Sequence, residues 1–320
     1  MKRNLTKLMS ICLLFLMACT ACTDGTDAMA QTAQDIADSQ KGTVMRDLTI
    51  HSDILGRDML YSVYLPANYT ESKQYPVLYL LHGWGGNQNE WWVYDDLADD
   101  ADKMIASDEV PEMVIITPDG QTWRYMDNNY GNGLYYERYF FEEFLPYVET
   151  RYRIRSDRSS RAIGGFSMGG YGALRYGFVH HDMFCYVYAL SAMLDGNGTV
   201  PMNEIAPEYA PSVLPGITLE CGDNDYFTTD NREFSAQLAS LGIAHEHIER
   251  PGSHDWDFWS ACSPKILRKV GDFFRQASTG IQNVSSHRHN VTAIYSLSGT
   301  RRDTMQRGIN IVNGKKIIKQ

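Results

Sequence analysis

Residues 161–173 constrain the fold of this chain more than any other segment. They read as an apolar strand, a sharp turn at Ser167 and a helix that begins with small residues. The pentapeptide Gly-Phe-Ser-Met-Gly at 165–169 puts glycine two residues before and after the serine, where a side chain would collide with the backbone of a tight strand-to-helix turn. Such a turn exposes the serine hydroxyl at the end of the strand. A glycine-rich turn without chemistry is the alternative interpretation.

Strand-like and helix-like segments alternate along most of the chain. Residues 43–53 and 59–65 alternate apolar and polar side chains around a turn, which predicts a β-hairpin. Alternating strands and helices after it predict an α/β fold, with a mostly parallel sheet covered by helices on both faces. The expected later strands are residues 76–81, 113–117, 161–166, 184–190, 216–220 and 245–249. The expected helices are residues 87–105, 137–153, 168–180, 228–241 and 265–277.

Composition divides the 320 residues into four parts. We expect a signal peptide at 1–18, a flexible tether at 19–42, the α/β domain at 43–280, and a linker with short strands at 281–320. The net charge is −10, and because the first 18 residues carry +3 and the last 40 carry +6, the residues between them carry −19. An acidic body repels nucleic acid and anionic lipid, so we expect no nucleic-acid partner and a neutral substrate.

The first residues have the features of an export signal. Three basic residues precede a short apolar run that ends in Leu-Met-Ala-Cys at 16–19, too short for a comfortable membrane span. The run resembles a bacterial lipobox with Cys19 as the lipidated residue. Cys22 is a second candidate, and an ordinary signal peptide is the alternative. We expect an exported protein at the outer membrane, cell surface or periplasm, touching the membrane only through its lipid.

The C-terminal segment contains β signals of its own. Asn313-Gly314 between apolar alternations is typical of a hairpin. The sequences at 295–299 and 308–316 resemble the sorting segments of type IX secretion substrates, with Asn310 where those have tyrosine. A vestigial β-element is the other interpretation.

A serine becomes nucleophilic when a histidine takes its proton and a carboxylate orients that histidine. In the chain order Ser, acid, His, the acid follows the strand at 216–220 and the histidine follows the last strand. Asp223 and Asp225 lie in the first of these loops and His254 lies in the second. We favour Asp225 as the acid because Gly222 can form the turn and leave Asp225 directed at the histidine. Asp223 then serves the turn itself.

The other histidines fit the role of base less well. They lie within strands, at a helix end, in the hairpin, in the C-terminal segment or in the loop at 82–86: His51, His82, His180, His181, His245, His247, His287 and His289. We therefore predict Ser167, Asp225 and His254 as the catalytic residues.

The loop His-Gly-Trp-Gly-Gly at 82–86 follows the strand at 76–81 and has glycines that expose backbone N–H groups. We predict the N–H groups of Trp84 and Met168 as the oxyanion hole, since two such donors stabilise a tetrahedral intermediate by roughly 3 kcal/mol each.

Four motifs carry a family resemblance: residues 81–86, 165–170, 221–225 and 252–256. In this order they resemble the esterase family of α/β-hydrolases that includes feruloyl and acetylxylan esterases, over about residues 43–277. The resemblance implies the α/β-hydrolase fold and the same catalytic Ser167, Asp225 and His254. Because residues 195–215 are too few for a large lid domain, we expect an open cleft.

The resemblance implies a serine esterase that releases feruloyl or acetyl groups from plant xylan, without metal or cofactor. Aromatic residues near the predicted mouth are candidates for stacking on a phenolic ring or a sugar: Trp84, Trp123, Tyr125, Tyr130 and Trp256, with Trp259 nearby. Packing within the loops is the alternative role for each of them. A general short-chain acyl esterase is the alternative function, followed by an acyltransferase and a non-catalytic binding protein.

The remaining cysteines are few. Cys185, Cys221 and Cys262 lie far apart, so we predict neither a disulfide framework nor a metal site. A Cys221–Cys262 bond is conceivable because both flank the predicted site. The sequence does not determine the oligomeric state.

Overall fold

The computed structural model describes residues 41–128, 134–194 and 214–279, and near the C-terminal end residues 294–295, 301–302, 308–312 and 315–319. The chain divides into two compact units, Met1–Ile281 and Gln282–Gln320. Cys19, Cys22, Tyr130, the predicted signal peptide and nearly all of the tether lie outside the described residues.

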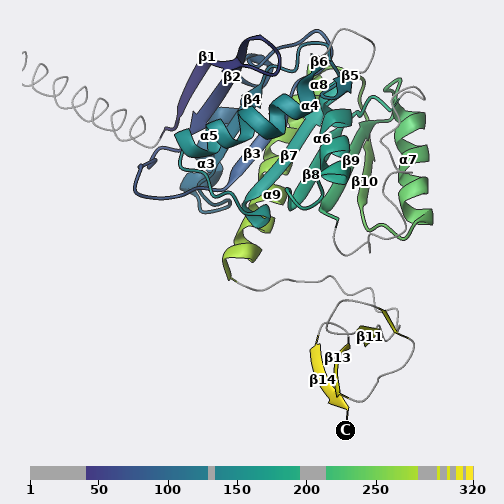
Figure 1. Cartoon of the computed structure of the whole chain (residues 1–320). Coiled ribbons are helices and arrows are strands. Elements are labelled where there is room, and N and C mark those ends of the chain that lie inside the picture. The colour runs from purple at the N-terminus through teal and green to yellow at the C-terminus, as the bar shows by residue number, and fades with distance from the viewer. Residues whose placement is uncertain are drawn as a thin grey trace, which may run out of the picture. The chain divides into compact units, whose positions relative to one another are not determined.

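An eight-stranded sheet with the order β1-β2-β4-β3-β7-β8-β9-β10 forms the centre of the first unit (Figure 1). β1 pairs antiparallel with β2 and β2 with β4, and all later neighbours pair in parallel. The strands are Thr43–Ser52 (β1), Arg57–Leu65 (β2), Val77–Leu81 (β3), Val114–Pro118 (β4), Arg161–Phe166 (β7), Tyr186–Leu190 (β8), Gly216–Gly222 (β9) and Glu246–Arg250 (β10). The predicted mostly parallel sheet with an antiparallel hairpin is confirmed.

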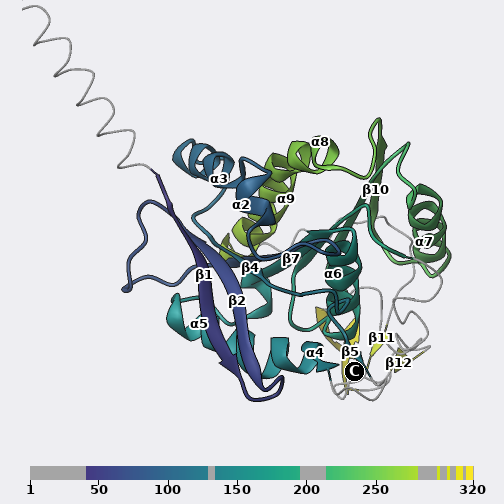
Figure 2. The ribbon, with the colours of Figure 1, turned by 90° about the horizontal axis from the view of Figure 1, so that it is seen from above.

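Helices cover both faces of the sheet, as predicted (Figures 1 and 2). One face packs against Leu97–Ala106 (α3), Trp256–Trp259 (α8) and Ser263–Thr279 (α9). The other packs against Tyr136–Tyr139 (α4), Leu145–Arg151 (α5), Met168–Val179 (α6) and Thr228–Ser240 (α7). The short strands Asp127–Asn128 (β5) and Leu134–Tyr135 (β6) pair with each other beside α4.

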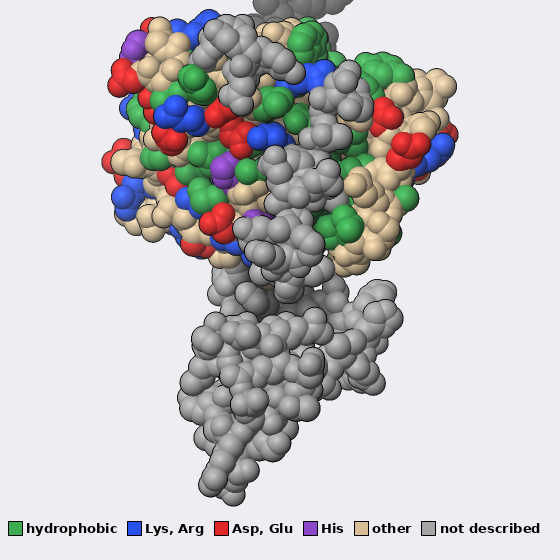
Figure 3. All heavy atoms as spheres, turned by 45° about the vertical axis from the view of Figure 1, so that its right-hand side comes forward, with side chains coloured by type: hydrophobic (Ala, Val, Ile, Leu, Met, Phe, Trp, Pro, Cys, Tyr) green, Lys and Arg blue, Asp and Glu red, His purple; other side chains and the backbone are tan. Residues whose placement is uncertain are grey.

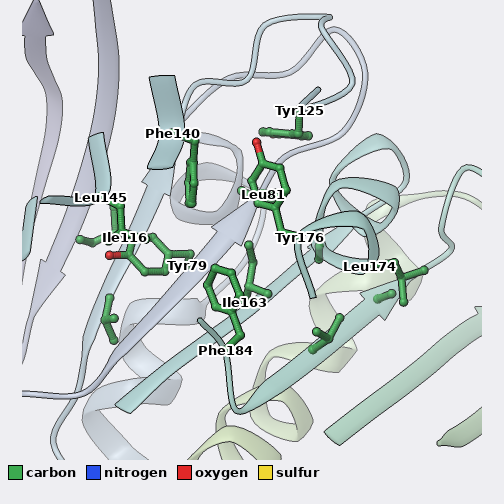
Figure 4. Packing of buried hydrophobic residues seen from close by; sticks show 14 of the residues in the cluster. Tyr79, Leu81, Ile116, Tyr125, Phe140, Leu145, Ile163, Leu174, Tyr176 and Phe184 are labelled. Carbon is green, nitrogen blue, oxygen red and sulfur yellow. The ribbon is translucent and has the colours of Figure 1, made fainter. Parts of the chain in front are cut away.

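The pleat of β3 divides its side chains between the two faces, because successive strand residues point to opposite sides. Val77, Tyr79 and Leu81 join the cluster under α4–α6, whereas Leu78 and Leu80 join the cluster under α3 and α9. Figure 4 shows Tyr79 and Leu81 of the first cluster together with Phe140. This continuous burial explains the unbroken apolar runs in the sequence.

Two of the helices predicted from the sequence are interrupted in the structure. The helix expected at 87–105 is two helices, Glu90–Val93 (α2) and α3, separated at Asp95 and Asp96, a residue type that favours helix ends. The helix expected at 137–153 contains a π-helical turn, Phe140–Phe144 (η1), just before Pro146. Proline has no N–H and clashes with the carbonyl four residues back, and the wider turn relieves that clash.

The second unit contains a four-stranded sheet with the order β12-β11-β13-β14. Its strands are Ile294–Tyr295 (β11), Arg301–Arg302 (β12), Gly308–Val312 (β13) and Lys315–Lys319 (β14). β13 and β14 pair antiparallel from Val312 and Lys315 outward, as the predicted hairpin requires, although Asn313 and Gly314 lie outside the described residues.

On the face drawn in Figure 3, acidic and basic side chains of the first unit are interspersed with apolar ones. Within the described part of the chain, no helix has the length and apolar character needed to cross a membrane.

Candidate active site

Ser167 lies at the junction of β7 and α6 with a backbone φ of 55° and ψ of −117°. A positive φ strains a residue that has a Cβ, so its surroundings must hold it in place. A Cβ on Gly165 would lie 2.6 Å from the Gly169 carbonyl oxygen, and one on Gly169 would overlap the Leu81 carbonyl. The two glycines of the pentapeptide therefore allow the turn that exposes the serine.

The predicted serine, histidine and acid come together in a hydrogen-bonded relay. His254 Nε2 lies 2.9 Å from Ser167 Oγ, and His254 Nδ1 lies 2.8 Å from Asp225 Oδ2. A carboxylate only accepts, so Nδ1 carries the proton and Nε2 can accept the serine proton. Burial opposes ionisation of Asp225, but hydrogen bonds from His254, the Phe227 N–H and Ser191 hold the pKa of its carboxyl below the usual value. The acid thus remains a carboxylate that orients the imidazole.

The loops that carry Asp225 and His254 are hydrogen-bonded to each other. The N–H of Asp223 donates to the Arg250 carbonyl and the N–H of Asn224 to the Gly252 carbonyl. Asp223 Oδ1 accepts from the Gly252 N–H at 3.2 Å, so Asp223 has the turn-stabilising role expected for it. These bonds fix the acid and the base relative to each other.

Three aromatic rings surround the His254 imidazole, with centroids at 4.3 Å (Tyr226), 4.8 Å (Trp259) and 5.3 Å (Phe227). Trp259 Nε1 also donates to Ser191 Oγ at 3.1 Å. Tyr226 is 71% exposed although its ring contacts the His254 imidazole. We did not predict Tyr226 or Ser191 from the sequence. Adjacency to Asp225 is the only sequence signal for Tyr226, and Ser191 has none beyond its place after a buried strand.

The two expected oxyanion donors lie at the same end of the sheet as Ser167. The Met168 N–H belongs to the first residue of α6, where helical N–H groups have no partner within the helix. Trp84 follows β3, which pairs with β7. Contact of Gly169 with the Leu81 and His82 backbone brings this loop against the first turn of α6. The two segments that carry the predicted donors therefore meet beside Ser167.

The predicted substrate-binding aromatics have different surroundings. Trp84 is 59% exposed. Trp256 is half-buried, 4.8 Å from the Phe166 ring, and Trp123 is half-buried against Tyr136. Trp259 is buried.

The expectation that Tyr125 lies at the mouth is wrong. Its side chain is fully buried (Figure 4), and its hydroxyl accepts from the His82 N–H at 3.0 Å and donates to the His82 carbonyl at 3.1 Å. The ring fills the space left by Gly120 and Gly172. Tyr125 therefore supports the loop that precedes Trp84 and cannot bind substrate with its ring.

His82 is buried, and both of its ring nitrogens have backbone partners. Its Nδ1 lies 2.7 Å from the Gly83 carbonyl, and its Nε2 accepts from the Gly120 N–H at 2.8 Å. Cys185, Cys221 and Cys262 are free thiols, so Cys221 and Cys262 do not pair. Among the described residues, no group of three or more His, Cys, Asp or Glu side chains could hold a metal ion.

The family profile described as "Putative esterase" matches residues 52–270. The chain belongs to this esterase family. A solved ferulic acid esterase is 34% identical to the esterase described here, with a TM-score of 0.66, and the match covers 73% of this chain and 99% of that one. The predicted resemblance is thus confirmed for the family and the fold.

Two relatives of this esterase are named for their activities. The endo-1,4-beta-xylanase/feruloyl esterase of Xylanibacter ruminicola is 26% identical over 71% of this chain, which spans only 31% of that larger protein. The acetyl esterase of Caldicellulosiruptor saccharolyticus is 26% identical over 63% of this chain and 86% of its own length.

Proposed function

We propose that this esterase is a serine carboxylic-ester hydrolase that acts on carbohydrate-linked esters, with feruloyl or acetyl groups of plant xylan as its acyl groups. The observation that carries the proposal is the unbroken relay Asp225–His254–Ser167, with both distances below 3 Å. A binding protein has no need of all three groups in this geometry.

The relay accounts for both steps of ester hydrolysis, the acylation of Ser167 and the deacylation by water. His254 Nε2 takes the Ser167 proton while the serine oxygen attacks the ester carbonyl, and Asp225 stabilises the imidazolium that forms. The carbonyl oxygen gains its charge between the N–H groups of Met168 and Trp84. The tetrahedral intermediate collapses as His254 gives the proton to the leaving alcohol. Water then attacks the acyl-serine by the same route, and the acid product and free Ser167 result.

Tyr226 supports an aromatic acyl group. Its exposed ring packs at a tilt of 39° against the His254 imidazole, with the ring centroids 4.3 Å apart. Large aromatic rings gain free energy when they stack on another ring and leave water. An extended phenolic acyl group can use this surface, whereas an acetyl group is too small to cover it.

A general short-chain acyl esterase is the second candidate, and the relative named acetyl esterase favours it. The two candidates share the relay and differ in what fills the space beside Tyr226. Aromatic-acyl hydrolysis therefore depends on the Tyr226 ring and acetyl hydrolysis does not.

The test compares kcat/KM of the full chain on methyl ferulate, p-nitrophenyl acetate and p-nitrophenyl butyrate, with Ser167→Ala as the blank. For a feruloyl esterase we expect serine-dependent ferulate release that falls about tenfold in Tyr226→Ala, a loss of roughly 1.4 kcal/mol, and is retained in Tyr226→Phe. Turnover of acetate and butyrate without ferulate would select the short-chain candidate. Turnover of none of them would contradict hydrolysis altogether and favour a binding protein.

We also propose export and lipidation at Cys19, on the basis of the basic N-terminus and the Leu-Met-Ala-Cys sequence. Cys19→Ala should move the protein from the membrane fraction to the soluble fraction and abolish incorporation of labelled fatty acid. Cys22→Ala is the matched control, and loss of label in that variant alone would move the site to Cys22.

A further inference from the structure

Glu90, the first residue of α2, folds its carboxylate back onto the loop 82–86. Both carboxylate oxygens lie where a Cβ on Gly86 would be, so only glycine leaves room for them. The Gly83 backbone is close enough to this carboxylate to lower its pKa. A side chain outside the relay thus contacts the loop on both sides of Trp84.

The position of the Glu90 carboxylate is energetically unfavourable. Among the described residues, Glu90 Oε2 is buried and has no hydrogen-bond partner. Burial raises the pKa of this carboxyl, and His82 and the Gly83 backbone offset only part of that effect. A buried polar atom without a partner costs about 1–3 kcal/mol. A buried oxygen without a partner beside the active site calls for an explanation, and we infer that the Glu90 carboxylate helps to hold the conformation of the loop 82–86.

The segment leading to Glu90 is anchored to the sheet. Asp47, at a bulge in β1, accepts from Gln88 Nε2 and Asn89 Nδ2, both at 2.6 Å. The next residue, Trp91, is fully buried and donates from Nε1 to the Leu81 carbonyl at 3.3 Å. The Glu90 carboxylate therefore contacts the loop 82–86 from a segment that is itself hydrogen-bonded to β1 and β3.

Two of the loop N–H groups have acceptors, because the His82 N–H donates to the Tyr125 hydroxyl and the Gly86 N–H donates to the Gly83 carbonyl. Among the described residues, no acceptor is found for the Trp84 N–H or for the Gly85 N–H that follows it. We propose that Glu90 is a positioning residue that fixes the loop 82–86 so that the Trp84 N–H faces the oxyanion. The inference rests on the hydrolase function proposed above.

This role predicts a specific kinetic pattern. A donor aimed at the oxyanion acts in the transition state more than in the bound substrate, so its displacement lowers kcat with little change in KM. Glu90→Ala removes the support and should lower kcat by roughly ten- to a hundredfold. Glu90→Gln keeps the side-chain oxygen and the volume without the negative charge. It should retain kcat within about threefold, because a carboxylate charge beside an oxyanion gives no benefit.

The experiment measures kcat and KM on p-nitrophenyl acetate, and the rate at which a fluorophosphonate labels Ser167, in the full chain and both variants. Phosphonylation also places a developing oxyanion in the same hole, so labelling tests Glu90 even if the natural ester is a different one. Glu142→Ala is the matched control, since Glu142 is an exposed carboxylate that pairs with Arg138. Thermal unfolding identifies any variant that fails to fold.

Slow turnover and slow labelling in Glu90→Ala, with both restored in Glu90→Gln, would support the proposal. Equal rates in the folded Glu90→Ala variant and the parent would overturn it, as would a Glu90→Gln variant as slow as Glu90→Ala. If the parent labels but hydrolyses no ester, the function proposal fails while the labelling rates still decide the role of Glu90. A parent that does neither would overturn both.

Discussion

At the scale of single residues, the site depends on a few positions where ordinary side chains do not fit. Ser167 adopts a positive φ because Gly165 and Gly169 let three backbone segments meet around it. The motif spacing predicted these contacts because sterics alone impose them. The buried place of Tyr125 was not predictable, since a tyrosine in an aromatic loop can equally face solvent or fill the space beside Gly120 and Gly172.

Gly169→Ala tests the steric argument. The added Cβ overlaps the Leu81 carbonyl, so the first turn of α6 must move away from β3. We expect kcat to fall by about a hundredfold or more, because displacement of the Met168 N–H removes most of its effect, and stability to fall by about 1–3 kcal/mol. Gly242→Ala, at a strained but open position with φ of 69°, should lower stability without changing kcat. Kinetics and thermal unfolding of the two variants separate these effects. Wild-type kcat in Gly169→Ala would contradict the close approach.

Asp225 and Asp223 provide a matched pair for the acid. Asp225→Asn removes the negative charge and introduces an amide N–H that can donate to His254 Nδ1 and favour the wrong tautomer, so kcat should fall by about 10⁴-fold. Asp223→Asn keeps an oxygen for the Gly252 N–H and should change kcat by less than about tenfold. Initial rates on p-nitrophenyl acetate decide between them. Equal losses would mean that the two carboxylates share the orienting role.

At the scale of elements, the relay depends on the ion pairs and hydrogen bonds that join the ends of β9 and β10. The buried Glu220 at the end of β9 accepts from Arg250 Nε at 2.5 Å and Lys265 Nζ at 2.7 Å. Arg250 also donates to the Phe258 carbonyl at 2.6 Å and so closes the loop that carries His254. The sequence places the acid and the base at these strand ends. It does not predict this ion cluster, because its partners lie in three separate segments.

Glu220→Gln should destabilise the protein by about 3 kcal/mol at neutral pH, because two cations lose a buried partner. Burial opposes ionisation of Glu220, but Lys265, Tyr188 and Arg250 hold the pKa of its carboxyl below the ordinary 4.5. A lowered folded-state pKa gives stability that is present above the unfolded value and lost as pH falls through the folded one. The difference between parent and variant should therefore be constant above about pH 5.5 and shrink below about pH 4.5. Denaturant unfolding from pH 3 to 8 measures it, and a difference that grows on acidification would contradict the assignment.

At the scale of the whole molecule, the relay, the loop 82–86 and every element that holds them belong to the unit Met1–Ile281. The fold class was predictable because alternation of strands and helices fixes the topology. The break between α2 and α3 and the π turn before Pro146 were not, because local chemistry interrupts an otherwise regular pattern there.

Deletion of residues 282–320 should leave kcat and KM on p-nitrophenyl acetate within about twofold of the full chain, since that unit has its own sheet and supplies none of the relay residues. The same kinetic assay applied to the full and shortened chains provides the comparison. A loss of kcat in a shortened chain that still unfolds at the parent temperature would assign the second unit a part in catalysis.

The most direct test of the account is rapid-quench mass spectrometry of the protein mixed with p-nitrophenyl acetate. We predict a burst of about one p-nitrophenol per active site and a protein that gains the mass of one acetyl group, located on Ser167 by peptide mapping. Ser167→Ala should show neither. Ester hydrolysis with no acyl group on Ser167, or an acyl group on another residue that Ser167→Ala retains, would contradict the central claim that Ser167 carries the reaction.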